Sequence, residues 1–141
     1  MSTSPIARFF DAFARQSNAD DAQAQAAQFA DAFLAAGPQG AQCVRSSDFA
    51  LALPKRKQLF DSLGCQSTTL VSLDETALDA RYVLVRTSWR MTFNRSNADP
   101  EHVLADSTFI VDTGSAEFKI VLYLANQDIM QVLKERAIAP A

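Results

Sequence analysis

Hydrophobic and polar residues alternate most regularly over residues 79–93, where one set of alternate positions is apolar and the other is mixed. A period of two residues indicates a β-strand. At about 3.3 Å per residue this segment would span about 50 Å, more than the roughly 40 Å diameter of a compact domain of this length. We therefore expect the strand to bend, at a bulge, and to curve its apolar face around the core. That face comprises Val83, Val85, Thr87, Trp89, Met91 and Phe93.

A hairpin is predicted farther along the chain, where Thr-Gly-Ser-Ala at 113–116 is typical of a two-residue turn with glycine at positive φ. Pairing residue 113 with 116 places 111 opposite 118, 109 opposite 120 and 107 opposite 122. Both strands then present apolar side chains on one face, so pattern and register agree. The polar segment 94–101 separates this hairpin from the preceding strand. The shared face comprises Phe109, Val111, Phe118, Ile120 and Leu122.

Apolar residues at helical spacing predict two helices near the N-terminus. Ser4 is expected to cap the first helix, with Pro5 at its first position. The segment 21–37 is expected to form a second helix, capped by Asp20 and stopped at Gly37, that packs inside the curved sheet. The apolar positions are Ile6, Phe9, Phe10 and Phe13 in the first helix and Ala26, Phe29, Ala30, Phe33 and Leu34 in the second.

The remaining predicted elements are shorter. A third helix is expected over 54–63, opened by Pro54 and ended by Gly64. A last helix from Gln127 is expected to be capped by Asn126, with Ile129, Val132 and Leu133 as its apolar stripe. Strands are predicted at 42–45, 68–73 and 117–125. The order of elements predicts an α+β fold with N-terminal helices packed on a curved antiparallel sheet.

The composition is that of a globular chain: 48 % of the 141 residues are hydrophobic, 21 % are charged and the net charge is −3. We expect one domain spanning residues 1–141. The negative charge gives no support for nucleic-acid binding, and no apolar run is long enough to cross a membrane. Because the N-terminal sequence lacks a basic start and an apolar signal core, we expect a cytoplasmic protein.

No motif points to a metal or a cofactor, and we predict neither. Cys43 and Cys65 fit no disulfide framework and no metal motif, so we expect buried thiols. His102 is the single histidine, which excludes a site with several histidine ligands, and we expect it at a solvated loop edge. The four glycines show no phosphate-loop or dinucleotide arrangement. The basic triplet 55–57 is expected on a solvated helix face.

This layout resembles the NTF2-like superfamily, and within it the bacterial SnoaL-like proteins. The residues that carry the resemblance are PKRKQLFDSLG at 54–64, SWRMTF at 88–93 and YLANQDIMQVLKE at 123–135. The resemblance implies a cone-shaped α+β fold with a pocket between the sheet and the N-terminal helices, often dimeric through the outer face of the sheet. The superfamily includes isomerases, dehydratases and polyketide cyclases as well as non-catalytic binding and transport modules, so the fold does not select a function.

The same resemblance supplies candidate catalytic and pocket residues. Steroid isomerases of the superfamily carry a tyrosine on the first helix, where this chain has Phe9 and Phe10. Their acid on an early strand corresponds most nearly to Asp48, and the acid that the cyclases place in the sheet corresponds to Asp106. An apolar pocket is expected to be lined by Phe13, Phe33, Trp89 and Phe109.

Trp89, the single tryptophan, has two interpretations. Burying its side chain removes about 150–250 Å² from water and contributes about 4–6 kcal/mol, which favours a plain core residue. Alternatively, it forms the wall of a pocket and its indole N–H meets a ligand.

The mixed face of the long strand predicts a subunit interface. If the hairpin around residues 93–102 pairs residues whose numbers add to 196, Arg90 lies opposite Asp106 and Arg86 opposite Ile110. Aromatic and arginine side chains among aliphatic ones are typical of such interfaces, so we predict a homodimer through the outer sheet face. The alternatives are a solvated outer sheet with one ion pair, or, should this face line the pocket, an anion site at the arginines. The expected interface residues are Tyr82, Arg86, Arg90, Asp106 and Tyr123.

We therefore expect a small-molecule-binding or accessory protein of the NTF2-like, SnoaL-like kind, with a small apolar ligand. The alternative is a cofactor-free isomerase, dehydratase or cyclase that moves a proton next to a carbonyl, with Asp48 or Asp106 as the base. A carboxylate in the pocket with a raised pKa would favour the enzyme.

Overall fold

The structure is a computed structural model that describes residues 4–19, 21–94 and 99–140. Within these residues it is an α+β fold with one six-stranded sheet, which confirms the predicted fold class. The elements are α1 (Pro5–Asn18), α2 (Ala22–Ala26), β1 (Phe29–Gly37), β2 (Gly40–Arg45), α3 (Ser46–Ser62), β3 (Cys65–Ala77), β4 (Tyr82–Phe93), β5 (Glu101–Asp112), β6 (Lys119–Ala125) and α4 (Ile129–Glu135).

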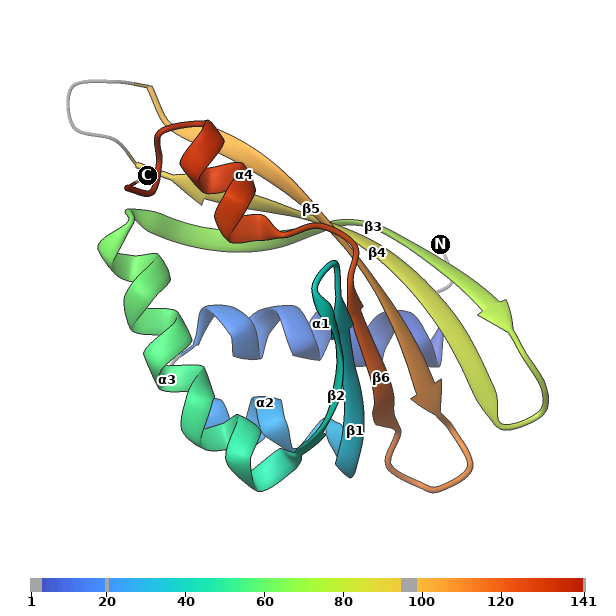
Figure 1. The fold of residues 1–141 in the computed structure, drawn as a ribbon. Helices are drawn as coiled ribbons and strands as arrows, with labels where there is room; N and C mark the ends of the chain where they lie inside the picture. The colour runs from blue at the N-terminus through green and yellow to red at the C-terminus, as the bar shows by residue number, and fades with distance from the viewer. Residues whose placement is uncertain (1–3, 20, 95–98, 141) are drawn as a thin grey trace.

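The strands lie in the order β2-β1-β6-β5-β4-β3, and neighbours are antiparallel except for β1 and β6, which run parallel. The long strands β3, β4 and β5 bend over α1, with α3 along one side of the hollow and α4 at one end (Figure 1). Buried residues of α1, α3 and α4 pack against the inward-facing side chains of the strands. The concave face of the sheet therefore forms the core, and its convex face points away from these helices.

The predicted long strand is confirmed as β4, with two differences. It begins at Tyr82 because the Asp79 side chain accepts hydrogen bonds from the backbone N–H groups of Arg81 and Tyr82 and so closes a turn. The irregularities that accompany the bend lie on the neighbouring strand β3, at Gln66 and Val71, whereas β4 pairs with β5 without interruption. The alternation of buried and exposed residues along β4 is as predicted.

The predicted register of β4 and β5 is wrong by two residues. Asp106 lies opposite Ser88, and its carboxylate accepts a hydrogen bond of 2.6 Å from the Ser88 hydroxyl. Arg90 lies opposite Leu104 instead. β4 ends at Phe93 and β5 begins opposite it at Glu101, so the connection, 94–100, is one residue shorter than the predicted segment 94–101. A shift of two residues leaves every side chain on its predicted face.

The predicted two-residue hairpin at 113–116 is wrong: β5 ends at Asp112, opposite Lys119, and residues 113–118 connect the strands. The pairing shifts again where Val121 is inserted as an extra residue. The insertion exchanges the two faces of the rest of β6. Leu122, predicted to face inward, lies opposite Ile110 on the convex face, and Tyr123 faces inward.

The predicted second helix is wrong beyond Ala26. α2 is capped by Asp21, whose side chain accepts a hydrogen bond of 3.1 Å from the Ala24 N–H. Asp20, the predicted cap, lies outside the described residues. The chain turns after α2 and continues as a strand instead of a helix.

That strand, β1, takes the place of the rest of the predicted helix. Phe29 and Phe33 are buried with ring centroids 4.5 Å apart, and a spacing of four residues fits one face of a strand as well as one face of a helix. Leu34 distinguishes the strand from the predicted helix. The helix would bury its side chain, whereas in the strand it is 40 % exposed on the convex face, beside Leu122. Gly37 ends β1 at the hairpin with β2. β2 confirms the strand predicted at 42–45.

α3 ends as predicted, before Gly64 with its φ of +89°, but it begins at Ser46. Pro54 therefore lies inside the helix, where it lacks the N–H that would bond the carbonyl of Ala50. The strand predicted at 68–73 is confirmed and is longer, β3. α4 is capped by Asp128 where we predicted Asn126, and Leu133 is buried as predicted.

α1 begins as predicted, with the Ser4 hydroxyl accepting a hydrogen bond of 3.0 Å from the Ala7 N–H. Its buried residues Phe10 and Phe13 contact Phe109 of β5, with ring centroids 4.9 and 5.6 Å away. This contact seats α1 in the hollow of the sheet and leaves space beyond the end of the helix.

A bidentate ion pair joins the ends of β4 and β5. The Arg81 Nε–H and Nη2–H donate to the two carboxylate oxygens of Asp112 at 2.7 and 2.8 Å, and the Gly114 N–H donates to the same carboxylate at 2.9 Å. The hydrogen bonds from Arg81 lower the pKa of Asp112 to about 2.

We predict that this ion pair stabilises the protein above about pH 4 and not near pH 2. The folded-state pKa of Asp112 lies below its unfolded value of about 4, so the contribution is present above that value and is lost as the pH falls towards 2. The difference in unfolding free energy between wild type and Asp112→Asn should therefore shrink between pH 7 and pH 2.5 in urea titrations. Asp11→Asn, an exposed change on α1, is the control. A difference independent of pH would contradict the prediction.

Candidate functional site

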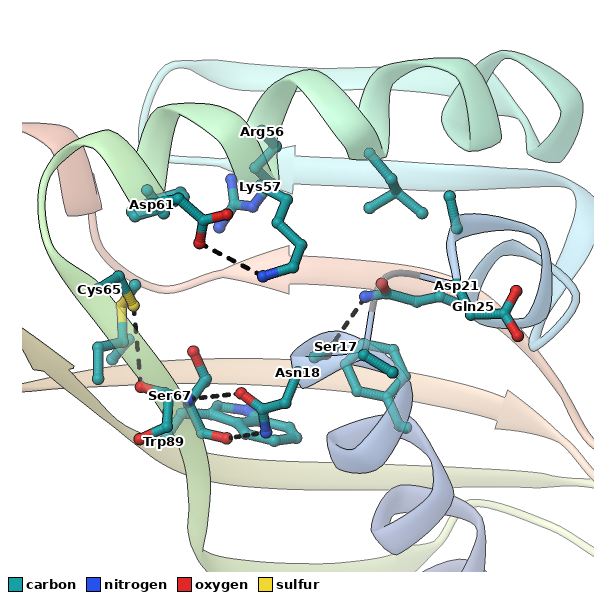
Figure 2. Close-up of a pocket in the computed structure, with 18 of the residues that line it drawn as sticks. Ser17, Asn18, Asp21, Gln25, Arg56, Lys57, Asp61, Cys65, Ser67 and Trp89 are labelled. Carbon is teal, nitrogen blue, oxygen red and sulfur yellow. Dashed lines mark hydrogen bonds and ion pairs between the residues drawn. The ribbon is translucent and has the colours of Figure 1, made fainter.

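A cavity of about 220 Å³ lies beyond the C-terminal end of α1, between α2, α3 and the concave face of the sheet (Figure 2). The helices supply one wall and the inward-facing residues of β3 to β6 supply the other. Three of the four predicted pocket residues line it: Phe13, Trp89 and Phe109. The fourth, Phe33, does not line it and packs against Phe49, with ring centroids 5.3 Å apart.

Aromatic rings form the sheet side of the cavity. The Phe13 ring lies 5.7 Å from the Trp89 ring. Tyr123 stacks on Phe109, with ring centroids 5.1 Å apart and planes 16° apart. Such a wall offers apolar area and face-to-face contact to a flat ring.

The indole N–H of Trp89 is already bonded inside the protein. It donates to the Thr87 hydroxyl at 2.7 Å, and that hydroxyl donates to the Ser107 carbonyl at 3.0 Å. Thr87 is only 3 % exposed, so this chain of hydrogen bonds is shielded from water. The interpretation in which the indole N–H meets a ligand is therefore wrong, although the ring still lines the cavity.

Charged side chains from α3 line the helical side. The Lys57 Nζ lies 3.3 Å from the Asp61 carboxylate, one helical turn away. The Arg56 guanidinium lies 4.8 Å from the centre of the Phe60 ring. Figure 2 shows Arg56 and Lys57 extending from α3 towards the sheet. Lys55 and Arg56 are exposed, as predicted for the triplet 55–57, whereas Lys57 is half-buried. Arg56 and Lys57 also line the cavity.

Asn18 closes the rim where α1 meets the edge strand β3. Its side-chain amide donates to the Thr68 carbonyl at 2.8 Å and accepts from the Thr68 N–H at 2.8 Å. It also donates to the Ala14 carbonyl at 3.0 Å. One side chain thus pairs both backbone groups of an edge residue, as a neighbouring strand would.

The two cysteines differ from the prediction of buried thiols. Cys43 is exposed on β2, and Cys65 is partly buried in the cavity wall. Burial raises the pKa of the Cys65 thiol, whose Sγ contacts the Ser67 carbonyl at 3.8 Å. Cys65 is therefore a neutral thiol at neutral pH.

No family model matches the sequence, and no curated protein matches it. Solved structures, in contrast, match almost the whole chain. An NTF2-like protein with a cystatin-like fold from Novosphingobium aromaticivorans has a TM-score of 0.73 at 12 % identity, over 96 % of this chain and 87 % of that one. The chain has the NTF2-like fold.

Two further structures share this NTF2-like fold. Aln2 from a Streptomyces species has a TM-score of 0.72 at 14 % identity, over 95 % of this chain and 97 % of that one. The β subunit of benzoate 1,2-dioxygenase from Burkholderia mallei has a TM-score of 0.70 at 12 % identity, over 94 % and 95 % of the two chains. The sequence resemblance to NTF2-like proteins is thus confirmed at the level of the fold.

The two candidate catalytic carboxylates do not lie in the cavity of this NTF2-like fold. Asp48 is exposed in the first turn of α3. Asp106 is exposed on the convex face and pairs with Ser88. The acidic residues that do line the cavity are Asp21, which caps α2, and Asp61.

The predicted interface residues lie on the convex face, with one exception. Tyr82, Arg86 and Arg90 share that face with Asp106, whereas Tyr123 lines the cavity because of the extra residue in β6. His102 also lies outside the cavity, exposed, with its Nδ1 3.1 Å from the Thr92 hydroxyl. No helix among the described residues is long and apolar enough to cross a membrane.

We predict that the Thr87 hydroxyl is required for the stability of the cavity wall. Thr87→Val keeps the shape of the side chain but leaves the buried Trp89 N–H without an acceptor, which costs about 1–3 kcal/mol of unfolding free energy. Thr87→Ser keeps the hydroxyl and is the matched control. Urea unfolding should show Thr87→Ser as the more stable variant, and the reverse order would contradict the prediction.

Proposed function

We propose that this NTF2-like protein binds a small, ring-containing apolar ligand in the cavity. The observation that carries the proposal is the aromatic wall of Phe13, Trp89 and Phe109 facing a cavity of about 220 Å³. Concave, mostly apolar sites with a few polar groups are typical of small-molecule binding. One protein with the same fold is the β subunit of an oxygenase, and this also fits an accessory role. Cytoplasmic location stays a prediction.

The alternative, a cofactor-free enzyme of proton transfer, has less support. Asp48 and Asp106, the bases predicted for it, both lie outside the cavity. Asp61 does line the cavity, but it is paired with Lys57 on the same helix. The binding function is therefore the one that the geometry supports best.

We predict that 2-acetylnaphthalene, a neutral ring compound, binds wild type with a Kd in the micromolar range in isothermal titration calorimetry. Ala105→Phe should weaken this binding at least tenfold, because Ala105 lines the cavity and the larger side chain fills it. Leu104→Phe is the matched control: it introduces the same side chain at the next residue, which is 60 % exposed on the opposite face.

Thermal unfolding of both variants checks that they fold. Equal binding by wild type and Ala105→Phe, or equal weakening by both phenylalanine variants, would contradict a binding site in the cavity. No binding to wild type at millimolar ligand would contradict the proposed function itself.

We propose in addition that the protein forms a homodimer through the convex face. Strand pairing aligns one apolar row across this face, running Leu84, Ile110, Leu122, Leu34. The row is flanked by Arg86, Thr108 and Leu124. A contiguous apolar surface with an arginine at its margin is typical of a subunit interface.

Leu122→Arg should separate the dimer, because it places a charge in the middle of this row. Sedimentation velocity is expected to give twice the 15.4 kDa chain mass for wild type and one chain mass for the variant. Leu51→Arg, at a leucine 73 % exposed on α3, is the control and should remain dimeric. A monomeric wild type at micromolar concentration would overturn the proposal.

A further inference from the structure

A second hollow of about 470 Å³ opens beside the hairpin of β1 and β2, and two side chains line both it and the cavity. They are Arg56 of α3 and Tyr123 of β6. One comes from the helical wall and the other from the sheet, so the two side chains face the same junction from opposite sides. The end of the cavity at this junction is therefore flanked by a cation and a phenol.

Most other polar groups of the cavity are already engaged. Asn18 is bonded to Thr68, Gln25 donates to Ser17 at 3.3 Å, and Lys57 pairs with Asp61. Among the described residues, Arg56 has no carboxylate partner and rests on an aromatic ring. Its guanidinium, on an exposed side chain at the edge of the cavity, can therefore pair with a group from outside the chain.

Two hydroxyls on the sheet side of the cavity have no hydrogen-bond partner among the described residues, those of Ser107 and Tyr123. Ser107 is only 8 % exposed, and what remains accessible faces the cavity. Phe109 pairs with Tyr123, so Ser107 and Tyr123 are diagonal neighbours on one face, about 7–8 Å apart at the backbone. A hydroxyl that reaches the cavity without a partner inside the protein can donate to an acceptor placed there.

We propose that the cavity selects a ring-containing carboxylic acid in its ionised form, with the ring on Phe13 and Trp89 and the carboxylate at Arg56, Ser107 and Tyr123. A guanidinium matches the planar, two-oxygen geometry of a carboxylate, and the hydroxyls donate to the same oxygens. This inference rests on the proposed function and names the class of its ligand.

The test compares two probes of nearly the same shape, the anion 2-naphthoate and the neutral amide 2-naphthamide, by isothermal titration calorimetry at pH 7.5. Wild type should bind the carboxylate at least tenfold more tightly than the amide. Arg56→Met should remove this preference while changing the affinity for the amide less than twofold. Ser107→Ala and Tyr123→Phe should each weaken carboxylate binding about tenfold. Lys55→Met removes the charge of an exposed neighbour that does not line the cavity, and should change neither affinity.

Each outcome decides the inference. Equal affinity of wild type for both probes, tighter binding of the amide, or an equal loss of both in Arg56→Met overturns the carboxylate preference and leaves the proposed function standing. An equal effect of Lys55→Met and Arg56→Met shows general electrostatic attraction and also overturns it. If neither probe binds wild type at millimolar concentration, the proposed function fails and the inference fails with it.

Discussion

Phe10 and Phe13 of α1 lie on Phe109 in the middle of β5, and the long strands must bend to keep this contact while still covering both ends of the helix. The irregularities on β3 accompany that bend without disturbing the pairing of β4 with β5. α1 ends at Asn18, before the sheet does. The cavity is the space that remains past the end of the helix, so its position is set by the length of α1 and the curvature of the sheet.

The chemistry of the cavity depends on which element covers that space. The sheet contributes rings because its concave face continues the core, whereas α3 contributes Arg56 and Lys57 between its buried residues Leu53 and Phe60. The polar groups of the sheet interior are also of two kinds: some are bonded within the protein, and others are left at the cavity. Thr87 is satisfied by the protein alone, and Ser107 presents a hydroxyl that no described residue satisfies. Paired residues of β4 and β5 thus differ: the Thr87 hydroxyl is bonded within the wall, and the Ser107 hydroxyl is left at the cavity.

Much of the fold was predictable from local pattern. The alternation along β4, the serine and proline that start α1, and the glycine that ends α3 each depend on residues close in sequence. The predicted strand register and the predicted type of element were wrong where pairing between residues distant in sequence decides them. Phe29 and Phe33 satisfy both periods, and only the pairing of β1 with β2 and β6 makes them strand residues. The extra residue at Val121 leaves no local signal, and it reverses the faces of the last residues of β6.

The site was predictable only in its apolar half. Phe13, Trp89 and Phe109 are indicated by the strand and helix patterns. Lys57 was missed because a proline is typical of the first turn of a helix, which favours a start at Pro54. With the helix starting at Ser46, Lys57 falls one turn after the buried Leu53, on the inward side.

The hydrogen-bonded environment of Trp89 gives the protein an optical property of its own. The chain has a single tryptophan, so its intrinsic emission comes from one fluorophore in one setting. The indole is 5 % exposed and bonded to a threonine instead of to water, a combination that shifts emission to shorter wavelength. Because the same ring is part of the cavity wall, occupancy of the interior can be followed by light without any label.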